Sequence, residues 1–208
     1  MTYAARPADA AIPPDHLADL LWNTDPKLNA FMFRTRETLL DILRAEWPET
    51  RGLLCHRHAF TVMDGASVLG LMVGHTAAEY GANFEAAQEI QMRHLSQDDA
   101  GYLAKALFWM DRLFPTPRAD SYYILELSTA ASAQGSGIAS HLLDAAEARA
   151  ISCGCTHLAL DVAADNAAVG FYRHKGFEVE IETRVPHLHE TCGIGLHLHM
   201  SRPLAVSQ

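Results

Sequence analysis

The sequence has little of what secreted, membrane-spanning and nucleic-acid-binding proteins require. Its 208 residues include only four cysteines, whose spacing forms no disulfide framework, so we expect reduced thiols in a cytoplasmic protein. No apolar run approaches the roughly 18 residues of a membrane span, and the first residues lack an apolar signal core. The formal charge of −9 leaves no basic surplus for nucleic acid phosphates. We therefore expect neither a membrane nor a nucleic acid partner.

Breaks between domains are also missing. The chain has no internal repeat, no low-complexity tract and no linker long enough to separate two units. Hydrophobic residues make up 49% of it and charged residues 20%, which is ordinary for a globular protein, and the length is ample for one core. The sequence therefore predicts a single α/β domain over residues 1–208.

Hydrophobic spacing and turn residues predict the elements of the first 120 residues. A short strand over 3–6 should precede two helices separated by the breaker Asn23-Thr-Asp-Pro26. A hairpin turning at Asp64-Gly65 should follow, and then two more helices, the second capped by Ser96. The expected ranges are 12–22 and 36–47 for the first helices, 60–63 and 68–74 for the hairpin strands, and 84–95 and 98–114 for the later helices.

The most informative stretch lies further along the chain. It reads as strand, glycine turn, helix, strand and short helix, and two further strands joined by a hairpin through residues 186–193 should follow it. The expected ranges are 122–128 for the first strand, 134–139 for the turn, 138–153 for the helix, 157–162 for the second strand, 165–177 for the short helix with its Gly-Phe end, and 178–185 and 194–200 for the last strands.

The glycine turn indicates an anion site. Gly135 and Gly137 lack a Cβ, so a ligand can approach the backbone amides closely. The turn runs straight into a helix, whose first N–H groups have no intrahelical partner and carry the positive end of the helix dipole. This arrangement can hold a pyrophosphate, although a glycine turn can equally be a plain connection.

Two segments together resemble the GNAT superfamily of acyl-coenzyme A N-acyltransferases. Gln134-x-x-Gly137-x-Ala139 is similar to its pyrophosphate loop, and Ala168-x-x-x-Tyr172-x-x-x-Gly176-Phe177 is similar to its second signature. The family's usual Asn, seven residues before the Tyr, is Asp165 here and is followed by Asn166. Either Asp165 replaces that Asn, or Asn166 serves after a slip of one residue.

The resemblance implies how acetyl-coenzyme A would be held. Backbone N–H groups of Leu127, Ser128 and Thr129, where the central strand splays from its neighbour, would bind the pantetheine and polarise the thioester carbonyl. Tyr172 would be the catalytic acid that protonates the departing sulfur, since a phenol with a pKa near ~10 suits a thiolate. Without the resemblance, a structural core tyrosine is the alternative. The residues expected around the pyrophosphate are Gln134, Gly135, Ser136, Gly137, Ile138, Ala139 and Ser140, with Asn166 as a further coenzyme contact.

Glu126 is the candidate general base. It lies inside an otherwise apolar strand, where a carboxylate is costly unless it is paired or used. Burial would raise its pKa towards that of a working base, acting on the incoming ammonium directly or through water. The alternative is that Glu126 pairs with a cation or a backbone donor and only braces the fold.

Four histidines alternate near the C-terminus and admit a metal site. A hairpin folded about Gly193 would bring His187 opposite His199 and His189 opposite His197, which would suit zinc or nickel. Because Pro186 and Gly193 favour a loop, the histidines are instead expected to be solvated or to border an acceptor pocket. We expect no metal.

The sequence therefore predicts a GNAT-type fold: a mixed, mostly antiparallel sheet flanked by helices, with a helical insertion before the central strand. Within it, residues of about 1–120 would face the acceptor, about 121–178 would bind acetyl-coenzyme A, and about 178–203 would form a C-terminal hairpin. The expected function is acetyl transfer from acetyl-coenzyme A to a primary amine, on a small molecule, by direct attack in a ternary complex. The alternatives are a protein N-terminal or lysine acetyltransferase and a non-catalytic coenzyme A sensor. The family analogy also admits a homodimer joined through the C-terminal strands.

Overall fold

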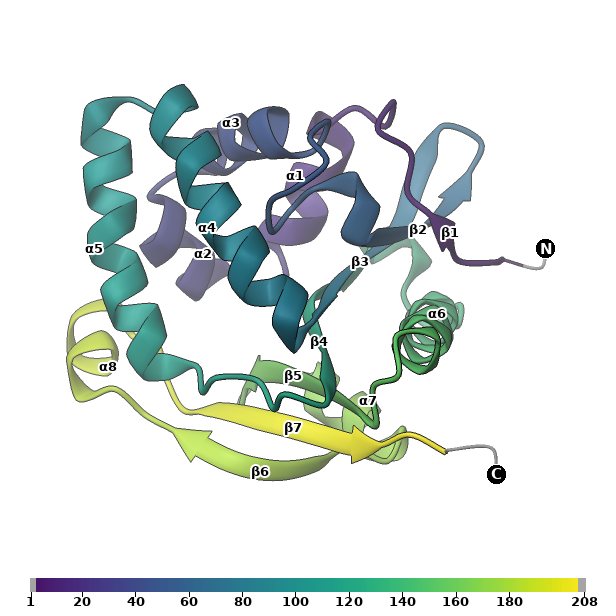
Figure 1. Cartoon of the computed structure of the whole chain (residues 1–208). Helices are drawn as coiled ribbons and strands as arrows, with labels where there is room; N and C mark the ends of the chain where they lie inside the picture. The colour runs from purple at the N-terminus through teal and green to yellow at the C-terminus, as the bar shows by residue number, and fades with distance from the viewer. Residues whose placement is uncertain (1–2, 206–208) are drawn as a thin grey trace.

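A seven-stranded sheet runs through the structure, a computed structural model that describes residues 3–205 (Figure 1). The strand order is β1-β2-β3-β4-β5-β7-β6, and only β4 and β5 run parallel among the described strands. The predicted mixed, mostly antiparallel sheet is confirmed, while the extreme ends of the predicted 1–208 domain lie outside the described residues. The strands are β1 Arg6–Pro7, β2 Ala59–Asp64, β3 Ser67–Thr76, β4 Ser121–Thr129, β5 His157–Ala163, β6 Glu178–Thr183 and β7 His197–Pro203.

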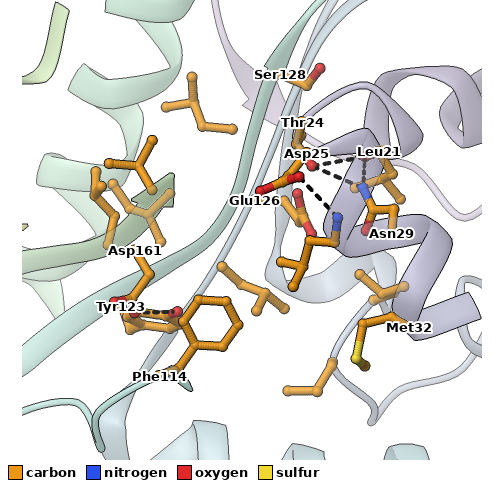
Figure 2. Close-up of a pocket in the computed structure, with 18 of the residues that line it drawn as sticks. Leu21, Thr24, Asp25, Asn29, Met32, Phe114, Tyr123, Glu126, Ser128 and Asp161 are labelled. Carbon is orange, nitrogen blue, oxygen red and sulfur yellow. Dashed lines mark hydrogen bonds between the residues drawn. The ribbon is translucent and has the colours of Figure 1, made fainter. Parts of the chain in front are cut away.

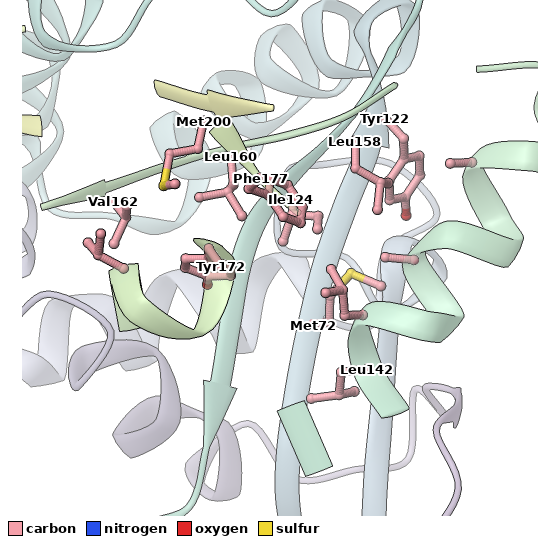
Figure 3. Packing of buried hydrophobic residues seen from close by; sticks show 14 of the residues in the cluster. Met72, Tyr122, Ile124, Leu142, Leu158, Leu160, Val162, Tyr172, Phe177 and Met200 are labelled. Atoms are coloured by element: carbon pink, nitrogen blue, oxygen red, sulfur yellow. The ribbon is translucent and has the colours of Figure 1, made fainter. Parts of the chain in front are cut away.

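Helices cover both faces of the sheet (Figure 1). One face packs against α6 and α7 through a core that includes Met72, Leu142 and Leu160 (Figure 3). The other face packs against the N-terminal helices through a core that includes Leu17, Leu39 and Leu71. The helices are α1 Asp15–Trp22, α2 Pro26–Phe33, α3 Arg36–Glu46, α4 Ala77–His94, α5 Gln97–Leu113, α6 Ile138–Ser152, α7 Ala168–His174 and α8 Pro186–Cys192, with single 3₁₀ turns at His56–His58 and Ala131–Ala133. Within residues 3–205, none of these helices is long and apolar enough to cross a membrane.

The predicted helical insertion is confirmed between β3 and β4. Thr76 caps the N-terminus of α4 in a capping box. The Thr76 hydroxyl oxygen accepts from the Glu79 amide, and the Glu79 carboxylate accepts from the Thr76 amide. Ser96 caps α5 as expected, accepting from the Asp99 amide at 3.1 Å. The insertion lies on the side of the sheet that also carries α1 to α3, where α4 packs beside α3 and α5 packs beside α2 (Figure 1).

Some local predictions were wrong, and one helix was missed. The predicted breaker at residues 23–26 does end α1 at Trp22, but α2 follows it at once, because Asp25 accepts from the Leu28 amide and Pro26 fits the first helical position. Residues 186–192 form α8 rather than a hairpin loop, with Pro186 at its start and Gly193 in a left-handed conformation at its end. The first strand is also displaced, to Arg6–Pro7.

Two irregularities of β4 create the opening for a site. Opposite β3, Ile124 pairs with Gly74 and Glu126 pairs with Val73, so Leu125 is the extra residue of a β-bulge. Beside β5, the parallel pairing ends at Ile124 and Leu160, and beyond that point β4 pairs with β3 alone. The two central strands therefore splay apart where the sequence predicted that they would.

Candidate active site

The glycine turn forms an open cradle of backbone amides ahead of α6. Gly135 and Gly137 both take left-handed backbone angles, with φ of +77° and +84°, and a Cβ added to either would meet nothing within 4 Å. Among the described residues, the amides of Gly135, Gly137, Ile138 and Ala139 donate to no acceptor. Free N–H groups at a helix N-terminus fit a diphosphate such as that of coenzyme A.

The other predicted loop residues contribute differently. The Ser136 hydroxyl donates to the Ala133 carbonyl, so it closes the turn. The Ile138 side chain is buried in the core, which leaves only its amide for a ligand. Gln134, Ala139 and Ser140 line the cavity that the cradle borders.

The amides of Leu127, Ser128 and Thr129 lie along the splayed part of β4. These residues pair with β3 and, among residues 3–205, have no strand partner on the β5 side, and all three line the cavity. The Ser128 hydroxyl donates to the Leu20 carbonyl at 2.8 Å, which ties the strand to α1. Because the Ala130 amide donates to Leu69 of β3, strand alternation turns the Ser128 amide towards β3 and leaves the amides of Leu127 and Thr129 on the open side, as a pantetheine arm would need.

Tyr172 lies on α7 between the core and the cavity. Its ring packs edge-on against Phe171 and Phe177, and Figure 3 shows it among the buried side chains. The residue also lines the cavity, and within the described structure its hydroxyl makes no hydrogen bond. Burial, and then the negative charge of Glu126, raise the pKa of Tyr172 well above its ordinary value, so the phenol stays protonated.

Of the two alternatives before α7, Asn166 is the residue that lines the cavity. Its amide group donates to the Thr24 carbonyl at 3.1 Å, and its oxygen accepts from the Ala168 amide. Asp165 points to solvent, where it lies 3.8 Å from Lys27. Asn166 therefore links the start of α7 to the loop before α2.

Glu126 faces the cavity from the first position after the bulge. Because Leu125 is the extra residue, Glu126 shares a sheet face with Tyr123, whereas regular alternation would have placed them on opposite faces. Desolvation raises the pKa of Glu126 to about 8. A hydrogen bond with the Thr24 side chain lowers this pKa in part, and the negative charge of Asp25 raises it. No basic side chain pairs with it among the described residues. The bracing alternative therefore lacks its cation.

One cavity of about 1080 Å³ joins these groups. Its lining includes the glycine turn, residues of β4 and β5, and residues of α2, α4 and α5. Figure 2 shows the part around Glu126, Tyr123 and Asp161. Its described lining holds five carboxylates and no lysine or arginine. The carboxylates are Asp25, Glu46, Asp111, Glu126 and Asp161.

Asp161 and Asp25 line the cavity but were not singled out by the sequence analysis. Asp161 accepts from the Tyr123 hydroxyl at 2.8 Å and lies 3.1 Å from Nδ1 of His199 (Figure 2). Asp25 Oδ2 lies 3.3 Å from Nε2 of His197. Burial raises the pKa of Asp25, but contacts with His197 and the Leu28 amide outweigh it and hold that pKa below its usual range. The Asp25-Pro26 pair, a standard helix start, was the available signal for Asp25, whereas nothing in its own strand singles out Asp161.

The four C-terminal histidines do not face one another. His187 lies on α8, where its ring stacks on that of Trp109 with centroids 4.3 Å apart. On β7, His197 pairs with Thr183 of β6 and His199 pairs with Ile181. The register needed for a zinc site is therefore absent. Within residues 3–205, no group of three or more His, Cys, Asp or Glu side chains is placed to hold a metal ion. His197 borders the acceptor side of the cavity, as the other interpretation expected.

Comparisons with known proteins agree with this geometry. A family model described as the acetyltransferase (GNAT) family matches residues 36–177. No curated protein sequence matches the chain.

Solved structures share the fold. An acetyltransferase crystal structure has 22% identity and a TM-score of 0.68, covering 97% of this chain and 99% of the other. An N-acetyltransferase from Staphylococcus aureus Mu50 has 17% identity and a TM-score of 0.71, with 95% and 99% covered. The IAA acetyltransferase from Bacillus cereus ATCC 14579 has 16% identity and a TM-score of 0.55, with 98% and 100% covered.

Proposed function

This chain belongs to the GNAT family of acetyl-coenzyme A dependent N-acetyltransferases, and we propose that it acetylates a primary amine on a small molecule. The single observation that carries the proposal is the acidic cavity, which opens onto the β4–β5 gap and has no lysine or arginine in its described lining. The carboxylates of this pocket attract an ammonium group.

The glycine turn and the β4 edge are proposed to hold acetyl-coenzyme A. The free amides between Gly135 and Ala139 would bind the diphosphate, with Gln134, Ser136 and Ser140 completing the loop. Leu127 and Thr129 would hold the pantetheine arm through their backbone, with Ser128 between them turned towards β3, and Asn166 would border the arm from the other side. The thioester would then lie where β4 and β5 separate.

Glu126 is proposed to accept the proton that the acceptor must lose. An ammonium ion has no lone pair, so it must give up a proton before its nitrogen attacks the thioester carbonyl carbon. A carboxylate with a pKa of about 8 is a far better proton acceptor than an ordinary glutamate. The direct attack forms the C–N bond and requires both substrates to be bound at once.

Tyr172 is proposed to supply the last proton. When the C–S bond breaks, coenzyme A leaves as a thiolate, which needs a donor. The Tyr172 hydroxyl makes no hydrogen bond within the described residues and borders the same cavity as Glu126, so no described acceptor competes with the thiolate for its proton. The backbone amides of β4 would stabilise the negative charge on the carbonyl oxygen during attack.

A small acceptor is favoured over a protein segment by one wall of the cavity. Helices α4 and α5 and residues 115–117 all contribute to the lining, so the insertion forms one wall of the acceptor space. This wall narrows the room for an extended peptide, whereas a small amine needs only the pocket itself.

Calorimetry and a thiol-release assay test the proposal together. We expect coenzyme A to bind the purified protein, and acetyl-coenzyme A to release free thiol faster when a suitable small amine is added. Absence of coenzyme A binding would overturn the proposal outright.

A further inference from the structure

Asp161 is a buried carboxylate that makes no ion pair with a lysine or arginine among residues 3–205. Its side chain is 4% exposed, and its partners are the Tyr123 hydroxyl at 2.8 Å and Nδ1 of His199 at 3.1 Å. An ionised carboxylate can accept about four hydrogen bonds, so two positions remain for a ligand. Asp161 lines the cavity on the same sheet face as Tyr123 and Glu126.

Aromatic rings line the cavity around Tyr123, the hydrogen-bond donor of this carboxylate. Tyr80 of α4 packs edge-on against Tyr123 with ring centroids 5.5 Å apart, and Phe84 stacks beside Tyr80. Phe114, at the end of α5, packs edge-on against His197 and appears next to Tyr123 in Figure 2. Tyr80, Phe84, Tyr123 and Phe114 all line the cavity, and aromatic faces attract a cation.

Apolar side chains make up much of the remaining acceptor space. Helices α2 to α5 all contribute to it, and neutral polar groups such as Asn29, Gln88 and Gln91 lie among the apolar ones. The apolar side chains of α2, α3 and α5 are Leu28, Met32, Phe33, Leu39, Leu103 and Leu107. A substrate carboxylate placed here would lose its hydration without gaining a lysine or arginine partner among the described lining residues, and five carboxylates would repel it. The walls thus suit a hydrocarbon or aromatic body.

We propose that the acceptor is a primary amine with an apolar body and no carboxylate, and that Asp161 binds its ammonium group. This inference rests on the proposed function and names its substrate class. In this proposal the two carboxylates have different roles. Asp161 binds the ammonium group and orients it against the aromatic rings, and Glu126 accepts the proton that the ammonium group loses.

Matched amine pairs on the unaltered protein test the substrate class. The probes are 2-phenylethylamine against phenylalanine and hexylamine against 6-aminohexanoate, in which the members of each pair differ in one carboxylate. We expect the carboxylate-free member to have a kcat/KM at least about 100-fold higher. Equal kcat/KM values within either pair would overturn the inference.

An Asp161→Asn variant tests the residue. The amide can still accept from the Tyr123 hydroxyl but carries no charge, so kcat/KM for 2-phenylethylamine should fall by about 10- to 100-fold, mainly through KM. The KM for acetyl-coenzyme A should stay unchanged. The matched control is Asp144→Asn on the exposed face of α6, which should leave both constants alone. An unchanged amine KM in a folded Asp161→Asn protein would remove Asp161 from this role.

Two failures are distinguishable. If coenzyme A binds but neither carboxylate-free amine is acetylated, the substrate class is wrong and the acetyl donor assignment stands. If coenzyme A does not bind, the proposed function itself is wrong.

Discussion

Tyr122 lies directly over Gly74, and this contact fixes the bulge in the central strand. The Tyr122 hydroxyl donates to the Gly74 carbonyl at 2.9 Å, while its ring occupies the space of a side chain at Gly74: an added Cβ would lie 2.5 Å from a ring carbon. The register between β3 and β4 shifts at this glycine. The orientation of the Glu126 side chain towards the cavity therefore depends on a glycine in the neighbouring strand.

Gly74→Ala should damage both stability and activity. The methyl group has no room beside the Tyr122 ring, and overpacking of this kind costs about 1–3 kcal/mol of unfolding free energy. Because the ring or the bulge must move, kcat/KM should fall by more than the loss of folded protein explains. Urea unfolding and steady-state kinetics measure the two effects.

Gly101→Ala is the control for this change. Gly101 lies on the exposed side of α5 with open space around it, so alanine should stabilise the helix by up to about 1 kcal/mol. A Gly74→Ala protein as stable and active as Gly101→Ala would show that the bulge does not need the glycine.

The sequence predicts the elements whose signals are local. Asp64-Gly65 specifies its own turn, and Ser96 caps the helix that begins next to it, so both are visible in a few residues. The glycine turn and Tyr172 are found in the same way, by short motifs. Their roles remain proposals, because a motif predicts chemistry only through its structural context.

What the sequence hides depends on contacts between distant segments. The strand alternation around Glu126 gives no hint that Leu125 is an extra residue, since the register is set by β3. Asp161 acquires its partners from β4 and β7, which lie about 40 residues away along the chain in opposite directions. Pro186 and Gly193 were visible but fit a loop or a helix equally well, and packing of Leu188 against Leu113 and Ile194 favours the helix.

Glu126→Gln should abolish the pH dependence of the chemical step. In the unaltered enzyme, a base with a pKa of about 8 is protonated at lower pH, so kcat/KM for the amine should rise through a midpoint near 8. The glutamine variant should lose this limb and about 10²–10⁴-fold of activity at high pH. A variant that keeps the wild-type limb would exclude Glu126 as the base.

The same substitution should stabilise the protein above pH 5. The folded state holds the Glu126 proton up to a pKa of about 8 and the unfolded chain only to about 4.5, so the folded state binds more protons in between. Stability therefore falls as pH rises from about 4.5 to 8, by up to about 5 kcal/mol at 1.4 kcal/mol per tenfold change in proton affinity. Glutamine removes this loss.

Unfolding midpoints at pH 5 and pH 9 check this prediction. The unfolding midpoint of Glu126→Gln should exceed that of the unaltered protein by more at pH 9 than at pH 5. Glu85→Gln, which removes an exposed carboxylate of α4, should show no such widening. A constant gap for both variants would mean that Glu126 titrates normally.

Tyr172→Phe should separate catalysis from binding. The phenyl ring keeps the contacts with Phe171 and Phe177, so stability and coenzyme A affinity should change little. Loss of the proton donor should lower kcat by about 10²–10⁴-fold. Calorimetry and single-turnover kinetics measure these quantities, and undiminished turnover would remove Tyr172 from the mechanism.

Gly137→Ala should weaken coenzyme A binding beyond its effect on folding. Gly137 has a φ of +84°, where a Cβ costs about 1–2 kcal/mol, and its methyl group would project into the open space of the cradle. Gly154→Ala imposes the same strain at the other end of α6, where φ is +75° and the surroundings are also open.

Both variants should lose similar stability in thermal unfolding. Only Gly137→Ala should raise the Kd for coenzyme A, by about tenfold or more, because the methyl group keeps the diphosphate from the amides. Equal Kd values for the two variants would place the diphosphate elsewhere.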